Sequence, residues 1–252
     1  MRPADRPQIY LGCAGWAISK ASSGRFPKDG THLQRYAQVF NAVEINSSFY
    51  RSHLPATYVR WAASVPGNFR FAVKIPRTIS HRARLLDCDT ALRVFLEEVW
   101  QLGPKLGCLL LQLPPSLAYS ASVALPFFEL LRHLHKGPVV CEPRHPSWFV
   151  RMVDRQLKDR DISRVAADPT CLPRAAVPRG IPVVQYLRLH GSPRLYYDSY
   201  PEATLRRISL KLGRPASHTL QRWCIFDNTA LGHATSNALD MLDYLRNNDR
   251  SS

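Results

Sequence analysis

Eight short β-branched or aliphatic runs recur along this sequence at roughly regular intervals. Each run has the length of one strand, and helix-like segments lie between most of them. Alternating strands and helices are typical of parallel sheets, because parallel neighbours need a crossover connection. The eight expected strands are Gln8–Gly12, Ala42–Ile45, Arg70–Val73, Cys108–Leu113, Pro138–Cys141, Ser163–Ala167, Val183–Leu189 and Gln221–Phe226.

The segments between these runs carry helix signals. Thr31 is a candidate cap, and Pro55 stands in the first turn of the second expected helix. The segment after the sixth strand is rich in proline and predicts only a short helix or an irregular stretch. The expected helices are Thr31–Gln38, Pro55–Ser64, Thr90–Leu102, Pro126–Leu134, Phe149–Lys158, Glu202–Leu212 and Thr235–Arg246.

Eight strands in 252 residues predict a closed (β/α)8 TIM-type barrel and not an open sheet. We expect one domain over residues 1–252, with flexible tails at 1–7 and 247–252. No apolar run approaches the ~20 residues of a spanning helix, and the polar N-terminus has no apolar signal core. We therefore expect a cytoplasmic protein without a membrane partner.

Charge and cysteine content limit the partners and the redox state. The formal net charge is +15, which favours anionic ligands or nucleic acid, although the basic residues are dispersed and solubility is an alternative reason. The cysteines form no CxxC pair, so buried free thiols are expected in preference to a metal site or disulfides. They are Cys13, Cys88, Cys108, Cys141, Cys171 and Cys224.

Polar residues follow seven of the expected strands. If side chains alternate with period two, these polar residues share one face at the carboxyl ends of the strands, where barrel enzymes have their active sites. This phase puts Asp227 on the opposite face. The alternative is a buried structural ion-pair network. The set comprises Glu44, Asn46, Lys74, Gln112, Glu142, Arg144, Asp168, Arg188, His190 and Asn228.

The residue types suggest roles. Glu142, Glu44, Lys74 and His190 are the catalytic candidates, because carboxylates and imidazole exchange protons and a buried amine is an electrophile, a phosphate ligand or an imine former. A structural ion pair is the alternative for Lys74. The expected substrate-binding residues are Arg144, Arg188, Asn46, Gln112, Asp168, His81, Tyr50, Trp148 and Asn228.

Cofactors are less defined. Glu44, Glu142, Asp168 and His190 are suitable metal ligands, but no HxH or HExxH spacing is present and several cations would lie nearby. We therefore predict no metal site, with binding of a divalent ion as the alternative. Gly-rich phosphate loops, GxSxG and the dinucleotide fingerprint are also absent from the sequence.

The order of the motifs resembles the bacterial and archaeal family called DUF72, or YecE-like. The resemblance implies a TIM-type barrel of unestablished role, with nucleic-acid binding suspected from the likeness of members to barrel endonucleases. It carries over the polar set above together with His81. The matching motifs are Gly12-Cys-Ala-Gly-Trp16, Val43-Glu-Ile-Asn-Ser-Ser-Phe-Tyr50, Phe71-Ala-Val-Lys-Ile-Pro76, Ile79-Ser-His81, Leu111-Gln-Leu-Pro-Pro115, Cys141-Glu-Pro-Arg-His-Pro-Ser-Trp148, Asp168, Leu187-Arg-Leu-His-Gly191 and Phe226-Asp-Asn228.

The chain departs from the family pattern in two places. Its first loop lacks two hydroxyls and two aromatic residues of the usual motif, and Asp227 stands where Asn is usual.

Three functions are consistent with these residues. The first is an enzyme that uses acid–base chemistry on a small anionic or sugar-like substrate. The second is a nucleic-acid binder or metal-assisted phosphodiesterase, and the third is a metabolite-binding protein without catalysis. The substrate, the reaction class and the oligomeric state do not follow from the sequence.

Overall fold

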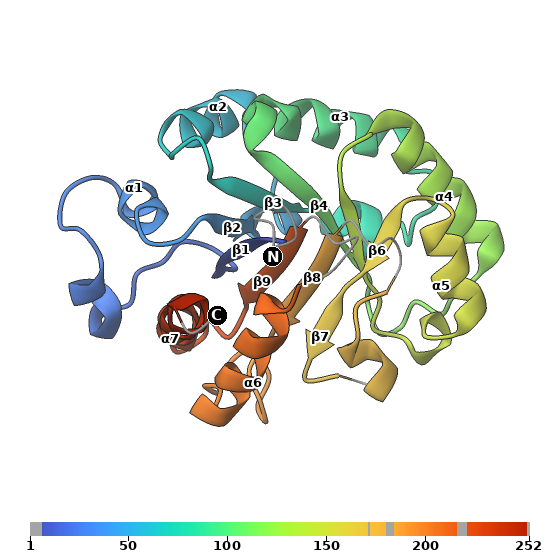
Figure 1. The fold of residues 1–252 in the computed structure, drawn as a ribbon. Helices are drawn as coiled ribbons and strands as arrows, with labels where there is room; N and C mark the ends of the chain where they lie inside the picture. The colour runs from blue at the N-terminus through green and yellow to red at the C-terminus, as the bar shows by residue number, and fades with distance from the viewer. Residues whose placement is uncertain (1–6, 171, 180–183, 216–220, 251–252) are drawn as a thin grey trace.

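The computed structural model describes residues 7–170, 172–179, 184–215 and 221–250. Parallel strands occupy the middle of the molecule, and the helices lie around their outside (Figure 1). The strands are β1 (Gln8–Cys13), β2 (Ala42–Ile45), β3 (Arg70–Lys74), β4 (Leu106–Gln112), β5 (Val139–Glu142), β6 (Ile162–Arg164), β7 (Ala166–Asp168), β8 (Val184–Leu189) and β9 (Gln221–Phe226).

The strands form two parallel sheets. One has the order β1-β9-β8-β7, and the other has the order β2-β3-β4-β5-β6. The mixed α/β fold is therefore confirmed, but the pairing is recorded as two sheets instead of the single closed sheet that was predicted. One cause is that the expected strand Ser163–Ala167 is divided into β6 and β7, with Val165 between them.

The two sheets approach each other at both edges. On one side, Ala14 forms an isolated parallel bridge with Glu44, and the Gly15 amide donates to the Glu44 carbonyl at 2.8 Å. On the other side, β6 runs directly into β7, and the Val165 amide donates to the Cys141 carbonyl at 2.8 Å. The carboxyl ends of all strands consequently lie at one end of the molecule.

The helices follow the predicted order with shifted ends. Thr31 caps α1 through a complete capping box with Gln34, as its sequence position suggested. The helix after β7 is only a short turn, which agrees with the proline-rich segment there. The helices are α1 (His32–Ala37), α2 (Pro55–Ala63), α3 (Asp89–Val99), α4 (Ala121–Leu134), α5 (Arg151–Lys158), α6 (Glu202–Gly213) and α7 (His233–Arg250).

Short helical turns connect several elements. They are η2 (Lys20–Arg25), η3 (Ser47–Phe49), η4 (Thr78–Arg82), η5 (Trp100–Lys105), η6 (Pro146–Trp148) and η7 (Pro173–Ala176). Residues 247–250, expected as part of a flexible tail, continue α7, because the helix extends further than its apolar stripe. The remaining tail residues, 1–6 and 251–252, lie outside the described residues.

Two apolar clusters lie on the two faces of the strands. The inner one includes Tyr10, Tyr186 and Trp223, whose rings pack at centroid distances of 4.6 and 5.8 Å. The outer one packs the strands against the helices. Gly12 is required between them, since a Cβ there would lie 1.9 Å from the Ala42 carbonyl oxygen. This inner cluster closes the space beneath the strand ends.

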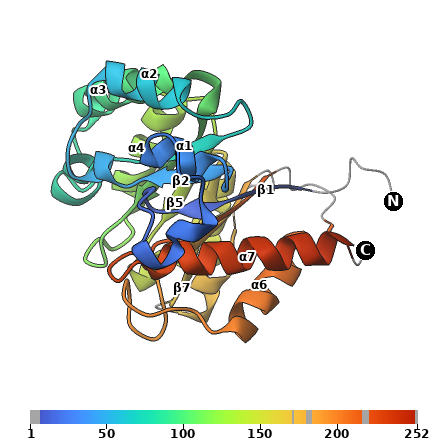
Figure 2. The same cartoon turned by 90° about the vertical axis from the view of Figure 1, so that its left-hand side faces the viewer.

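Helix α7 runs along one side of the molecule and packs beside α6 (Figure 2). No helix among the described residues has the length and apolar character needed to cross a membrane. The five described cysteines are buried free thiols, as predicted, and Cys171 lies outside the described residues.

Candidate functional site

The site lies on the inner face at the carboxyl ends of the strands. Ala42, Ala72 and Val140 belong to the inner apolar cluster, so the residues two positions later face the same way. This alternation brings Glu44, Lys74 and Glu142 together above the cluster, as the sequence predicted. By the same rule Arg188 faces inward, because it lies two positions after Tyr186 of the inner cluster.

Arg188 is the centre of this group and is fully buried. Its Nε and Nη2 donate to the two carboxylate oxygens of Glu44 at 2.9 and 2.6 Å. Its Nη1 donates to Glu142 Oε2 at 3.0 Å, and its Nη2 lies 3.0 Å from Asp227 Oδ2. Tyr186 also donates to Glu44 at 2.9 Å. One guanidinium therefore compensates three buried carboxylates from three strands.

His190 lies between two of these carboxylates. Its Nε2 is 3.0 Å from Glu142 Oε1, and its Nδ1 is 3.0 Å from Asp227 Oδ2. Burial opposes the charged imidazolium, but Glu142 and Asp227 outweigh it and raise the pKa of His190. Burial likewise opposes ionisation of Glu142, yet Arg188, His190 and Arg144 hold its pKa well below the ordinary value. The arrangement is a carboxylate–imidazolium–carboxylate chain.

Arg144 and Tyr196 cover this chain. Arg144 Nη2 lies 3.0 Å from Glu142 Oε1, and Nη1 donates to the Tyr196 hydroxyl at 3.1 Å. The Tyr196 ring packs edge-on against His190, with centroids 5.7 Å apart. Tyr196 has φ +69°, a left-handed conformation that costs energy for an aromatic residue. About a quarter of the Arg144 side chain is exposed, so this residue joins the network to solvent.

Lys74 differs from the other charged residues of the site. It is only 4% exposed, yet its ammonium has no hydrogen bond or ion pair within the described part of the chain. The nitrogen lies 4.0 Å from the centroid of the Phe49 ring, a cation–π contact. Burial and the nearby Arg188 lower the pKa of Lys74 to about 8, against the opposing effect of the carboxylates.

Three further predicted residues surround the cluster. Gln112 is Glu142's register partner and is 8% exposed, and no hydrogen bond of its side chain occurs among the described residues. Asn46 follows Glu44 by two positions, and its buried Oδ1 has no partner in the described structure. His81 packs against Phe49, and burial and Lys74 lower its pKa.

Four predicted site residues lie elsewhere. Asp168 pairs in register with Leu189, which faces the outer core, and it accepts the Tyr200 hydroxyl at 2.9 Å. The Trp148 ring is 1% exposed in the outer core, and Tyr50 is 66% exposed. Asn228 donates to the Asp198 carbonyl at 3.0 Å and to Asn237 at 2.9 Å. The predicted placement of Asp168 and Asn228 on the face of the cluster is wrong, and the substrate-binding role expected for Tyr50 and Trp148 stays a prediction.

Asp227 and Tyr186 belong to the site but were missed. The assumed phase of the last strand put Asp227 on the opposite face, although Trp223 and Ile225 belong to the inner cluster and Asp227 follows in phase with them. Every residue from Trp223 to Phe226 is apolar, so polarity alone did not distinguish the two faces. Tyr186 precedes Arg188 by two positions, and this spacing was the available signal.

The residues that were considered as metal ligands do not suit a cation. Glu44 and Glu142 are occupied by Arg188, Asp168 is on the outer face, and His190 contacts carboxylates through both nitrogens. Within residues 7–170, 172–179, 184–215 and 221–250, no group of three or more His, Cys, Asp or Glu side chains has the geometry of a metal site. The site instead presents ammonium, guanidinium and imidazolium groups, which suit anions.

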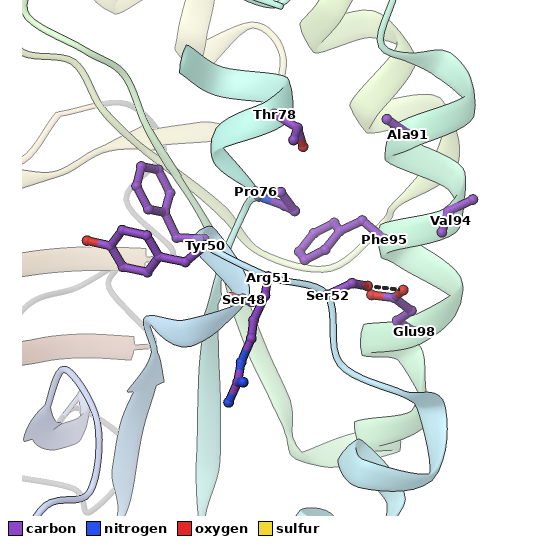
Figure 3. A pocket seen from close by; sticks show the side chains of 11 residues that line it. Ser48, Tyr50, Arg51, Ser52, Pro76, Thr78, Ala91, Val94, Phe95 and Glu98 are labelled. Atoms are coloured by element: carbon purple, nitrogen blue, oxygen red, sulfur yellow. Dashed lines mark hydrogen bonds between the residues drawn. The ribbon is translucent and has the colours of Figure 1, made fainter. Parts of the chain in front are cut away.

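A hollow of about 290 Å³ lies beside the site. Phe49, which contacts Lys74, is one of its lining residues. Figure 3 shows Phe95 and Glu98 of α3 on one side of this hollow and Tyr50 on the other, and Ser52 donates to Glu98. We call it the α3 pocket. Its volume is just below the lower limit of about 300 Å³ for ligand pockets.

Comparison with known proteins gives relatives without an established activity. The Escherichia coli K12 protein YecE, of the group UPF0759, is 34% identical over 168 residues, which are 64% of this chain and 59% of YecE. YunF of Bacillus subtilis 168, also UPF0759, is 27% identical over 56% of this chain and 52% of YunF. The chain therefore matches less than two thirds of the length of these relatives.

Solved structures agree on the fold. The crystal structure of a DUF72 protein from Thermotoga maritima MSB8 is 23% identical, has a TM-score of 0.79, and the match covers 95% of this chain and 99% of that one. A DUF72 protein from Enterococcus faecalis V583 gives 23% identity and a TM-score of 0.77 over 95% and 96% of the two chains. The family model described as "Protein of unknown function DUF72" matches residues 10–252. The chain belongs to the DUF72 family.

Proposed function

We propose that this chain is an enzyme that transfers protons to or from a small anionic substrate at the carboxyl ends of the strands. The observation that carries the proposal is the ammonium of Lys74, which forms no hydrogen bond or ion pair in the described structure and contacts the Phe49 ring, while Arg188 and His190 are fully paired with carboxylates. A buried cation normally requires a partner. A bound anion would supply it.

The charges of the cluster support an anionic ligand. With lysine and histidine protonated, four cationic side chains face three carboxylates, which leaves an excess of one positive charge. Low exposure makes this excess effective, because water screens it little. The cations are Lys74, Arg144, Arg188 and His190, and the carboxylates are Glu44, Glu142 and Asp227.

The roles follow from the protonation states. His190 is the proton carrier, since Glu142 and Asp227 raise its pKa and so favour the protonated ring. Glu142 stays ionised because its pKa is depressed, and it orients His190 instead of exchanging protons itself. This differs from the role first suggested for Glu142. Lys74 and Arg144 would hold the anion and any developing oxyanion.

The test measures proton exchange at carbon. The protein is incubated in D2O with 2-oxo acids and with sugar phosphates, and deuterium uptake is followed by NMR. We expect uptake with at least one compound and a loss of about 10²–10⁴-fold in His190→Gln. His133→Gln, an exposed histidine, is the matched control. Absence of exchange, together with absence of thermal stabilisation by every compound, would overturn the proposal.

The proposed site takes residues from both sheets, namely from β2, β3, β5, β8 and from the end of β9. The two sheets must therefore stay together for the site to exist. We propose that both sheets act as one closed eight-stranded barrel. The bridge between Ala14 and Glu44 supports closure on one side, and the single residue Val165 between β6 and β7 supports it on the other. Hydrogen-exchange protection of the Gly15 and Val165 amides comparable to that of mid-strand amides is the expected result.

A second function, nucleic-acid binding, is favoured by one surface groove of about 1030 Å³. It lies along α5 and beside η7, where a full helix would otherwise cover the strands. Six basic and two acidic residues line it, and Arg164 is already paired with Asp154 at 2.8 Å. The basic residues are Arg151, Arg155, Lys158, Arg164, Arg174 and Arg179.

The second function predicts a steep dependence of affinity on salt. Each phosphate contact contributes about 0.9 to the slope of log K against log salt, so the double variant Arg155→Gln, Lys158→Gln should lower the slope by roughly 2. Lys28→Gln, exposed and outside the groove, should leave it unchanged. An affinity for duplex DNA that does not vary between low and moderate salt would exclude this function.

A further inference from the structure

The amine of Lys74 has the properties of a nucleophile. Ordinary lysines have pKa values near 10.4, and at neutral pH almost none of their amines carries a free electron pair. The pKa of Lys74 is lowered to about 8, so about a tenth of it is neutral at pH 7. Its nitrogen also makes no hydrogen bond in the described structure that would occupy this electron pair.

Proton carriers and anion ligands stand around this amine. The charges of Arg188, His190 and Lys74 together lower the pKa of Asp227, so the Lys74 amine lies within electrostatic range of the carboxylate that His190 contacts. Gln112 follows Leu110 of the inner cluster by two positions in β4 and so shares its face, and the buried Oδ1 of Asn46, directly after β2, has no partner in the described structure. Arg144, with its partly exposed guanidinium, lies over Glu142. An amine, a proton donor and an anion ligand are the three groups that imine formation with an anionic carbonyl compound needs.

We propose that Lys74 forms an imine with the carbonyl carbon of a small aldehyde or ketone that carries a carboxylate or phosphate. This inference rests on the proposed function and names the substrate class of the same site. The Lys74 nitrogen attacks the carbonyl carbon, so a C–N bond forms and the C=O π bond breaks. Arg144 holds the anionic group of the substrate.

The protons balance without any further reactant. The oxygen of the adduct takes a proton from His190, and the nitrogen releases one, which restores the imidazolium. A second proton from His190 then lets the hydroxyl leave as water while the nitrogen electron pair forms C=N. In sum, the neutral amine, the imidazolium and the carbonyl compound give a protonated imine, a neutral imidazole and water. Lys74 releases one proton to the solvent when it becomes neutral, and His190 takes one up from the solvent afterwards. Relative to the resting site with both groups protonated, the charge is therefore unchanged.

The experiment traps the imine by reduction. The protein is mixed with glyoxylate, a two-carbon anionic aldehyde, and sodium cyanoborohydride at pH 7, and the product is mapped by peptide mass spectrometry. The chain has seven lysines, and the six other than Lys74 serve as internal references. From the neutral fractions, we expect Lys74 to be modified on the order of a hundredfold faster than exposed lysines. Its rate should rise with pH to a plateau above about 8.

Variants test the parts separately. Lys74→Met should abolish the fast modification, whereas Lys28→Arg, an exposed lysine, should leave it unchanged. Arg144→Met should slow the modification of Lys74 by tenfold or more with glyoxylate but not with uncharged acetaldehyde. Equal effects on both aldehydes would overturn the anionic part of the inference.

A second ligand separates the two proposals. Glycolate has the charge of glyoxylate but no carbonyl group. If glycolate stabilises the wild type thermally and Lys74 is modified no faster than other lysines, the imine is overturned and the anion site stands. If glycolate gives no stabilisation that depends on Lys74 and no fast modification occurs, both proposals fail. Fast modification of Lys74 supports the inference.

Discussion

Replacement of Lys74 by methionine should stabilise the protein, although the residue is buried and its side chain is long. Methionine matches the unbranched stem and keeps a favourable sulfur contact with Phe49. The pKa of Lys74 falls from 10.5 to about 8 in the folded state, which corresponds to about 3 kcal/mol at ~1.4 kcal/mol per pH unit. Loss of the cation–π contact offsets about 0.5–2 kcal/mol of this. We expect a net gain of about 1–3 kcal/mol at pH 7.

The stability advantage of Lys74→Met over the wild type should decrease at high pH. Between pH 8 and 10.5 the unfolded chain keeps the lysine proton that the folded chain has lost, so the stability of the wild type rises relative to the variant. The advantage of Lys74→Met should therefore be constant below pH 8 and fade by pH 10.5. Tyrosines and other groups that titrate in this range are common to both proteins and cancel.

The assay is urea unfolding of the wild type and Lys74→Met at pH values from 6 to 10, followed by tryptophan fluorescence. Lys28→Met serves as the control for removal of an exposed lysine, and its effect should stay within about 0.5 kcal/mol. A variant less stable than the wild type at pH 7, or a gain that does not change with pH, would refute the reasoning. It would mean that the ammonium is better compensated in the folded protein than its lowered pKa indicates.

Three further outcomes are expected. Glu44→Gln should cost about 3–5 kcal/mol in urea unfolding because it leaves Arg188 undercompensated, and Tyr186→Phe only about 1 kcal/mol. The stability difference between wild type and His190→Gln should be largest below pH 6.5 and shrink as pH rises through the raised pKa of His190; a constant difference would contradict this. Gly12→Ala should lower the unfolding midpoint by forcing β1 and β2 apart, at a cost of about 3 kcal/mol.

Much of the fold follows from the sequence because hydrophobic period and length identify strands well. The bounds of β2 and β9 agree with the expectation to the residue. The start of α4 was expected at Pro126, but the helix begins at Ala121 and contains the proline. Pairing across β6 and β7 could not be predicted, since it depends on contacts between distant segments.

The alternation of side chains along the strands predicted some of the site residues correctly. The period of two assigns Glu44, Lys74 and Glu142 correctly to one face because each strand carries one polar residue near its end. The period does not say which face is the inner one when both faces of a strand are apolar. For this reason Asp168 was predicted on the inner face, although it lies on the outer one, and Asp227 was predicted on the outer face, although it lies on the inner one. Arg188 forms ion pairs and Lys74 forms none among the described residues. This difference depends on distances between side chains of different strands, and the period of the sequence carries no information about them.

The pairing of β1 with β9 has a consequence for the order in which the chain can fold. Every strand of the β2–β6 sheet pairs with its neighbour in sequence, so that sheet can grow as the chain leaves the ribosome. β1 pairs in register from Gln8 with Gln221, so it must wait until β9 has been synthesised. Until then the edge of β1 that pairs with β9 stays open to pairing with other chains. The interval before β9 emerges is thus the period in which a nascent chain most needs protection by a chaperone.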